Sequence, residues 1–98
     1  MQYYHYKSID ELLMYITNVN FAKIFDVTKN DCIETRISNY IIDKSIDNYY
    51  DLLTDISDVD IRSFLEYLNN SEIEEIELFQ NKERKYYINL VKKVIQIY

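Results

Sequence analysis

Three aspartates at four-residue spacing are the side chains whose arrangement most clearly suggests a chemical role. Asp47, Asp51 and Asp55 would share one face of a helix, about 6 Å apart along its axis. Like charges at this spacing repel one another, so the chain accepts a modest loss of stability by keeping them. A row of carboxylates attracts cations and basic proteins, and it can imitate the charges of a nucleic-acid strand. The spacing therefore predicts a surface that binds a basic partner.

The acidic side chains are concentrated in the part of the chain that contains these aspartates. The 98 residues have a formal net charge of −6. Residues 46–78 hold ten acidic side chains and one basic one, Arg62, which gives −9, whereas residues 1–45 carry −1 and residues 79–98 carry +4. We expect the partner to be a larger protein with a basic surface that handles nucleic acid, for example a nuclease. Charge complementarity would accelerate the encounter.

Tyrosine is the second feature that suggests a binding surface. The chain has 11 Tyr, more than one small core takes up easily, because a buried phenol needs a hydrogen-bond partner. Exposed tyrosines are enriched at protein interfaces, where they provide a large contact area for few rotatable bonds. The candidate partner-binding residues are Asp47, Tyr49, Tyr50, Asp51, Asp55, Asp58, Glu66, Tyr67 and Glu74.

A plainer interpretation of the same residues stays open. Acidic side chains are favourable at helix N-termini, so several of these carboxylates would serve only to begin helices. The pair Asp58 and Asp60 is explained by capping more simply than by metal binding. A genome rich in A and T also encodes many tyrosines without any selection for binding.

Several kinds of catalytic and cofactor site are excluded by composition. The chain has no Gly and no Pro, so it lacks the Gly-dependent turns of phosphate-binding loops, dinucleotide-binding folds and nucleophile elbows. One Cys and one His do not supply the four ligands of a structural zinc site. Cys32 and His5 fall on different predicted elements, which argues against a nucleophile and base pair. We therefore expect no enzyme activity, no cofactor and no metal.

The basic C-terminal stretch is the one segment that suggests nucleic-acid binding. Its cations are interleaved with Tyr86 and Tyr87, which could stack on bases. The acidic chain as a whole would repel a polyanion, so we expect no direct nucleic-acid contact. The basic residues concerned are Lys82, Arg84, Lys85, Lys92 and Lys93.

Helix-start signals divide the chain into the elements that would position these side chains. Ser8 to Glu11 and Ser71 to Glu74 match the capping box, in which a serine and a glutamate satisfy free amides at a helix start. Apolar residues then recur at three- and four-residue steps, which favours helices. Residues 20–26 fit either a helical turn or a strand. The expected helices span about 9–18, 28–44, 45–56, 57–70 and 72–97, the last as one helix or as two that meet near Asn81.

These elements predict an all-α fold, a small compact helical bundle of about five helices in a single domain over residues 1–98. The absence of Gly argues further against hairpins, because their tight turns favour positive φ angles. An α+β alternative remains, because Tyr3, Tyr4, Tyr6 and residues 94–98 favour strands. In it, a short N-terminal strand pairs near the C-terminus.

No motif identifies a family, so the functional expectation depends on the size and composition of the chain. The chain has no run of about 18 apolar residues and no signal-peptide pattern, so we expect the cytosol of a host cell and no membrane. In size and charge it resembles stand-alone inhibitors of phages and mobile elements, the anti-CRISPR and toxin-immunity proteins. The resemblance implies an inhibitor that blocks a basic nucleic-acid-handling site. The alternative is a self-associating helical module, a possible homodimer, in which 72–97 pairs with a partner helix.

Overall fold

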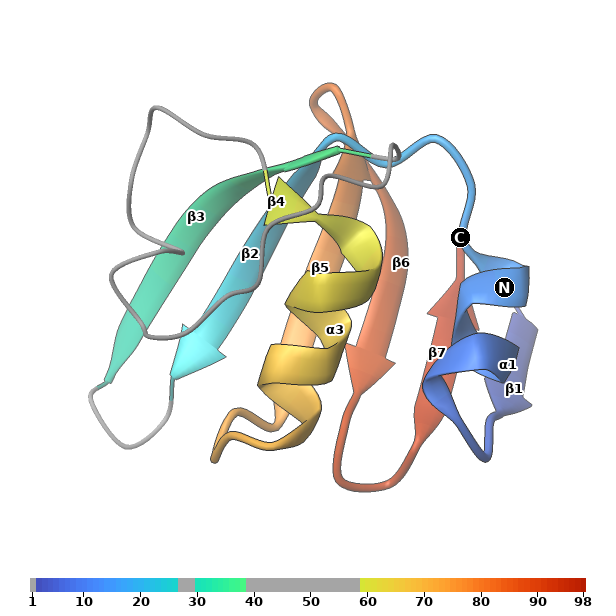
Figure 1. Cartoon of the computed structure of the whole chain (residues 1–98). Helices are drawn as coiled ribbons and strands as arrows, with labels where there is room; N and C mark the ends of the chain where they lie inside the picture. Colours follow the sequence, from blue (N-terminus) through green and yellow to red (C-terminus); the bar gives the residue numbers. More distant parts are fainter. Residues whose placement is uncertain (1, 27–29, 39–58) are drawn as a thin grey trace.

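The fold is built on one seven-stranded sheet, seen in a computed structural model that describes residues 2–26, 30–38 and 59–98 (Figure 1). The strand order is β1-β7-β6-β5-β2-β3-β4. Neighbouring strands run antiparallel except β3 and β4, which are parallel. The strands are β1 (Gln2–His5), β2 (Phe21–Asp26), β3 (Asp31–Ser38), β4 (Val59–Asp60), β5 (Glu75–Gln80), β6 (Glu83–Asn89) and β7 (Val94–Ile97), and the described helices are α1 (Ile9–Tyr15) and α3 (Ile61–Asn69).

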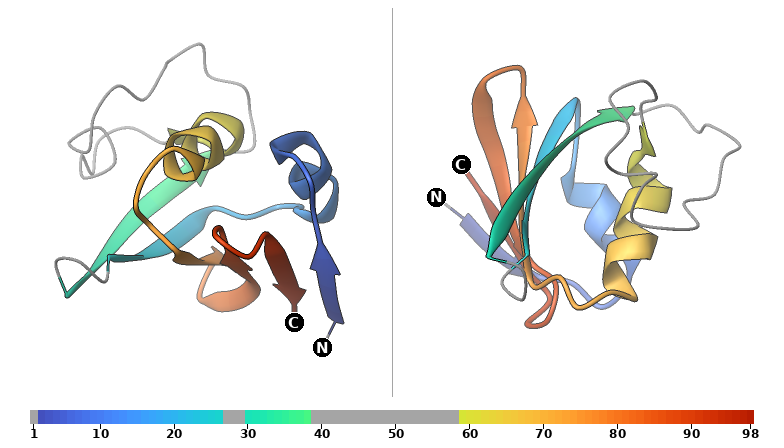
Figure 2. Two further views of the ribbon diagram at one scale, coloured as in Figure 1. Left: turned by 90° about the horizontal axis from the view of Figure 1, so that it is seen from below. Right: turned by 90° about the vertical axis from the view of Figure 1, so that its left-hand side faces the viewer.

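Both described helices cover the same face of the sheet, and the core lies between the two layers (Figure 2). Buried residues alternate with more exposed ones along β2, β3 and β5, so these strands send every second side chain under the helices. From α3, Phe64, Leu65 and Leu68 complete this core. The fully buried strand residues include Ala22, Ile24, Ile76, Leu78, Ile88 and Ile95.

Helix α1 begins where the sequence predicts, whereas α3 begins at Ile61, later than the predicted start near residue 57, because Val59–Asp60 form β4. The Ser8 hydroxyl accepts the Glu11 N–H at 3.2 Å before α1, although the Glu11 carboxylate accepts from the amide of Lys7 rather than from that of Ser8. Before α3, the Asp60 carboxylate accepts the N–H groups of Arg62 at 3.0 Å and Ser63 at 3.4 Å. Local capping chemistry therefore fixes both helix starts.

The prediction of an all-α bundle of about five helices is wrong. Within the predicted helix 28–44, residues 31–38 form β3, and the predicted helix 72–97 contains β5, β6 and β7. Residues 20–26 include β2, which agrees with the strand interpretation left open there. The α+β alternative is closer, because the N-terminal strand β1 pairs with the C-terminal strand β7. The predicted helix 45–56 lies outside the described residues.

Asparagine explains why the lack of Gly does not prevent hairpins. The turn between β5 and β6 consists of Asn81 and Lys82, and Asn81 has a φ of 56°. Asn30, beside the start of β3, has a φ of 51°. Asn tolerates the left-handed region better than most residues do, so it takes the role that Gly usually fills in tight turns. Lys93 shows the same sign of φ between β6 and β7.

In the described part of the chain, no helix is long and apolar enough to span a membrane.

Candidate functional site: the open face of the sheet

The face of the sheet opposite the helices is a surface on which side chains from several strands meet. In β2, Ala22 and Ile24 are buried on the helix side, so the alternate residues point to the other side. The strand register places matching residues of β3, β5 and β6 beside them. We call this surface the open face, and it includes Phe21, Lys23, Phe25, Cys32, Glu34, Arg36, Glu77, Phe79, Arg84 and Tyr87.

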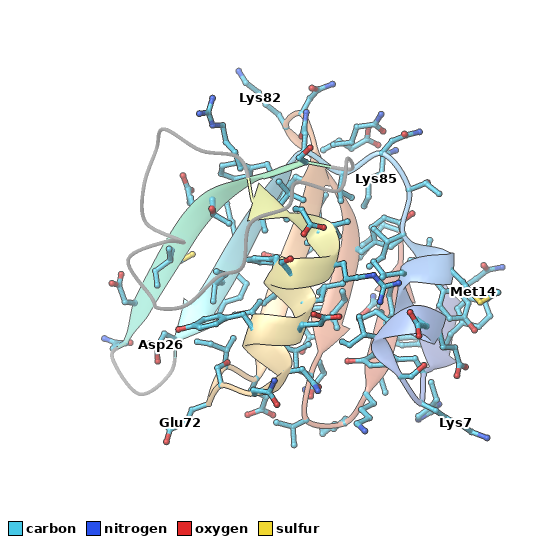
Figure 3. The ribbon with its side chains drawn as sticks, viewed as in Figure 1. Lys7, Met14, Asp26, Glu72, Lys82 and Lys85 are labelled. Atoms are coloured by element: carbon cyan, nitrogen blue, oxygen red, sulfur yellow. The ribbon has the colours of Figure 1, made fainter. Side chains whose placement is uncertain are left out.

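A hollow of about 490 Å³ lies on the open face near the turn between β5 and β6. Three of its lining side chains are basic and one is acidic, which is opposite in sign to the chain as a whole. Figure 3 shows Lys82 at this end of the molecule, with Asp26 and Glu72 at the far end. We call this hollow the basic hollow. Its lining residues are Asn20, Phe21, Lys23, Glu34, Arg36, Phe79, Asn81 and Lys82.

Two phenylalanines form an apolar centre within the basic hollow. The rings of Phe21 and Phe79 meet edge to face, with 5.8 Å between centroids and 71° between planes. The Lys23 ammonium nitrogen lies 5.2 Å from the centroid of the Phe79 ring, within cation–π range. The register explains this proximity, because Phe21 of β2 pairs with Phe79 of β5.

Hydrogen bonds around Asn20 hold the rim of the basic hollow. The Asn81 N–H donates to the side-chain oxygen of Asn20 at 2.8 Å, and the Asn20 side-chain amide donates to Asn81 Oδ1 at 3.0 Å. The Asn20 backbone N–H donates to the Phe79 carbonyl at 2.9 Å, and its carbonyl accepts from Ile37 at 3.0 Å. One residue thus ties the start of β2 to β3, β5 and the hairpin turn. Such support favours a preformed binding surface.

A second hollow of about 330 Å³ lies on the open face toward β7, and internal contacts occupy its charged side chains. Arg84 pairs with Glu77 at 2.7 Å and lies 4.0 Å from the centroid of the Tyr98 ring. The hydrogen bond that Arg84 donates to the Glu77 carboxylate raises the pKa of Arg84. Burial raises the pKa of Tyr87, with a further contribution from its hydrogen bond to Glu75. This region is suited to holding the sheet together.

The predicted partner-binding residues are divided between described and undescribed parts of the chain. Among the described ones, Glu66 is exposed on α3 with its carboxylate 3.7 Å from Arg62. Tyr67 of α3 is half-buried against the core, and Glu74 accepts a hydrogen bond from Asn89 at 3.5 Å. These three residues contribute nothing to the basic hollow. The other predicted residues, Asp47, Tyr49, Tyr50, Asp51, Asp55 and Asp58, lie outside the described residues.

The basic C-terminal stretch is divided by the fold. Lys82 lies in the turn before β6 and Lys85 near the start of β6, whereas Lys92 and Lys93 lie in the turn between β6 and β7. Tyr86 is buried, and its hydroxyl accepts the Thr17 N–H at 3.2 Å, so it cannot stack on a base. The continuous nucleic-acid-binding segment considered from the sequence therefore does not form.

Cys32 and His5 lie near opposite edges of the sheet. Four strands separate β1 from β3, a distance of about 24 Å at the usual strand spacing. Cys32 is an exposed free thiol. Over residues 2–26, 30–38 and 59–98, no three His, Cys, Asp or Glu side chains converge as metal ligands would.

The sequence interpretation missed the side chains that line the basic hollow. A signal for them is present, because Phe21 and Lys23 in β2, and Glu34 and Arg36 in β3, recur at the two-residue period of a strand face. What joins them to Phe79 is the pairing of β2 with β5.

Comparison with models of known protein families, with curated proteins and with solved structures finds no match to this chain.

Proposed function

We propose that this chain is a non-catalytic binding protein that contacts another protein through the basic hollow. The observation that carries the proposal is an apolar pair, Phe21 and Phe79, with Lys23, Arg36 and Lys82 around it on a face that the described helices leave uncovered. Protein interfaces commonly combine an aromatic centre with a charged rim. The matching partner surface carries a carboxylate beside an aromatic or aliphatic side chain.

A protein partner is favoured over a single-stranded nucleic acid. Base stacking needs a free ring face, whereas the Lys23 ammonium lies over the ring of Phe79 and Phe21 meets that ring edge to face. The net charge of −6 also repels a polyphosphate at long range. A short acidic segment of a protein needs favourable charge over a few side chains, which the basic hollow offers.

Inhibition is the biological form of this binding that we propose. A chain of this size acts on a larger protein by covering one of its surfaces, as the small inhibitors that it resembles in size and charge do. The acidic segment that contains Asp47, Asp51 and Asp55 stays a prediction as a second contact region, directed at a basic site of the same target. Replacing these three residues with Asn together tests that region separately.

The test compares charge reversals at two lysines, the half-buried Lys23 and the exposed Lys92. Wild type, Lys23→Glu and Lys92→Glu are used as baits against a lysate of the native host, and captured proteins are quantified by mass spectrometry. Lys92 is the control, because it lies in the β6–β7 turn and takes the same charge change. We expect a captured protein whose recovery falls about tenfold with Lys23→Glu, which corresponds to about 1.4 kcal/mol, and is unchanged with Lys92→Glu.

Two results would contradict the proposal. In one, every captured protein responds equally to the two lysine variants. In the other, a fluorescent oligo-dT strand binds the wild type at physiological salt and is released by Lys23→Glu, which would make the basic hollow a nucleic-acid site.

A further inference from the structure

The outer edge of β1 presents backbone groups to which no described residue is paired. Backbone groups in an antiparallel strand alternate between pointing toward the neighbour and pointing away. The Tyr6 N–H donates to the Lys93 carbonyl at 3.0 Å, and Tyr4 pairs with Ile95 two residues earlier. The backbone N–H and C=O groups of Tyr4 therefore point toward β7, while those of Tyr3 and His5 point away from it. β1 is the terminal strand of the sheet on this side.

The two edges of the sheet differ in how they are protected. Natural edge strands avoid unwanted pairing by being very short, by carrying Lys or Pro, or by bulging. At one edge, β4 pairs only with Ile37 and Ser38 of β3 and leads directly into α3, and the rest of β3 carries charged side chains, namely Asp31, Glu34 and Arg36. At the other edge, β1 has four residues, Gln2–His5, and contains no Asp, Glu, Lys, Arg or Pro. Among the described residues, nothing pairs with the outer edge of β1, so this edge can accept another strand.

Exposed apolar side chains lie beside the same edge. Tyr3 is 62% exposed on β1, and Met14 is 81% exposed on α1, the helix that stacks Tyr15 against Tyr4 of β1. Figure 3 shows Met14 pointing away from the molecule on the β1 side. A strand added at this edge would cover contact area on both faces of the sheet as well as the backbone groups.

We propose that two copies of this chain associate through antiparallel pairing of their β1 strands. With a twofold axis beside Tyr4, Tyr3 of each copy meets His5 of the other. The outward groups then form two reciprocal pairs, which satisfies both residues in both copies. The second copy suits the edge because β1 contains no Asp, Glu, Lys or Arg, so the paired strands of two chains of net charge −6 add no contact between like charges. This contact is separate from the basic hollow, and it replaces the helix pairing of 72–97 that the sequence suggested.

A cysteine mixing experiment tests this register. In a Cys32→Ser background, Tyr3→Cys and His5→Cys are prepared separately, both at exposed positions. In a dimer of one variant alone, each introduced cysteine faces an unmodified residue of the second copy. In a dimer that contains one copy of each variant, the two introduced cysteines face each other. Paired residues at hydrogen-bonded positions lie about 5.5 Å apart between Cα atoms, within disulfide range. We expect an equimolar mixture to form disulfide-linked dimers under mild oxidation at least tenfold more than either variant alone.

A second measurement removes one outward amide. Tyr3→Pro deletes the N–H that points away from β7 and leaves the β1–β7 hydrogen bonds unchanged, a position at which edge strands tolerate Pro. Tyr3→Phe is the matched control. Sedimentation over concentrations from about 10 μM to about 1 mM should show a dimer for wild type and Tyr3→Phe and a monomer for Tyr3→Pro, in the range of weak, small interfaces. The proposal would be overturned if the wild type were a monomer at every concentration, or if each cysteine variant alone formed as much cross-linked dimer as the mixture does.

Discussion

Asn20 and Asn81 exchange two hydrogen bonds across 61 residues of sequence, one of 2.8 Å to a backbone amide and one of 3.0 Å between side chains. The first supports a turn residue with a φ of 56°, and both fix the rim of the basic hollow. A side chain outside the strands thus determines how the hairpin turn sits against β2.

Asn20→Ala should therefore weaken both the fold and the binding surface. Two hydrogen bonds are lost at an exposed site, so we expect the free energy of unfolding to fall by about 1–2 kcal/mol in urea denaturation. Asn69→Ala, at the exposed end of α3, is the control and should change stability by less than about 0.5 kcal/mol. Equal effects of the two substitutions would show that the Asn20 bonds contribute nothing.

Asp60→Ala should destabilise the protein more than Ser8→Ala, although both residues cap helices. Asp60 is 5% exposed, and its carboxylate accepts from two amides and the Ser63 hydroxyl, whereas Ser8 is exposed and accepts from one amide. We expect a loss of about 2 kcal/mol for Asp60→Ala and about 1 kcal/mol or less for Ser8→Ala. Thermal or urea unfolding measures both, and the reverse order would refute the ranking.

Tyr6→Phe should stabilise the protein and change its behaviour in alkali. Tyr6 is 3% exposed, its hydroxyl has no hydrogen-bond partner among the described residues, and burial raises its pKa to about 12. Removing the hydroxyl should raise the free energy of unfolding by about 1 kcal/mol at neutral pH.

The pH dependence of that variant follows from the direction of the pKa shift. Ionisation of Tyr6 is easier in the unfolded chain, where its pKa is near 10, so the wild type loses stability as pH rises from about 10 toward about 12. Tyr6→Phe should lose less over this range. Tyr98→Phe, at a partly exposed tyrosine, serves as the control, and parallel curves for all three proteins would contradict this assignment.

Local signals in the sequence predict some of the fold correctly. The caps at Ser8 and Asp60 depend on residues three positions away or fewer, and the inward residues of α3 follow the helical period. The same period was misleading in 72–97. Ile76 and Leu78 also alternate as in a strand, and the serine at 71 accepts the Ile73 amide in a turn that no helix follows.

The candidate site was not predictable from local pattern because its parts come together through distant pairing. Phe21 meets Phe79 once β2 lies beside β5, and neither neighbourhood alone indicates the other. The charge count along the sequence does not reveal this site for a related reason, because it averages over segments of the chain while the strands regroup side chains by face. Lys23 and Arg36, inside a nearly neutral segment, thus join Lys82 from a basic one.

The pairing of β1 with β7 has a consequence for the order of folding. Gln2 of β1 pairs with Ile97 of β7, so β1 leaves the ribosome long before its partner strand β7. Closing so long a loop is slow compared with forming the β5–β6 and β6–β7 hairpins. A nascent chain therefore keeps β1 unpaired on both sides until synthesis reaches β7, and this interval is when premature association between neighbouring chains is most expected.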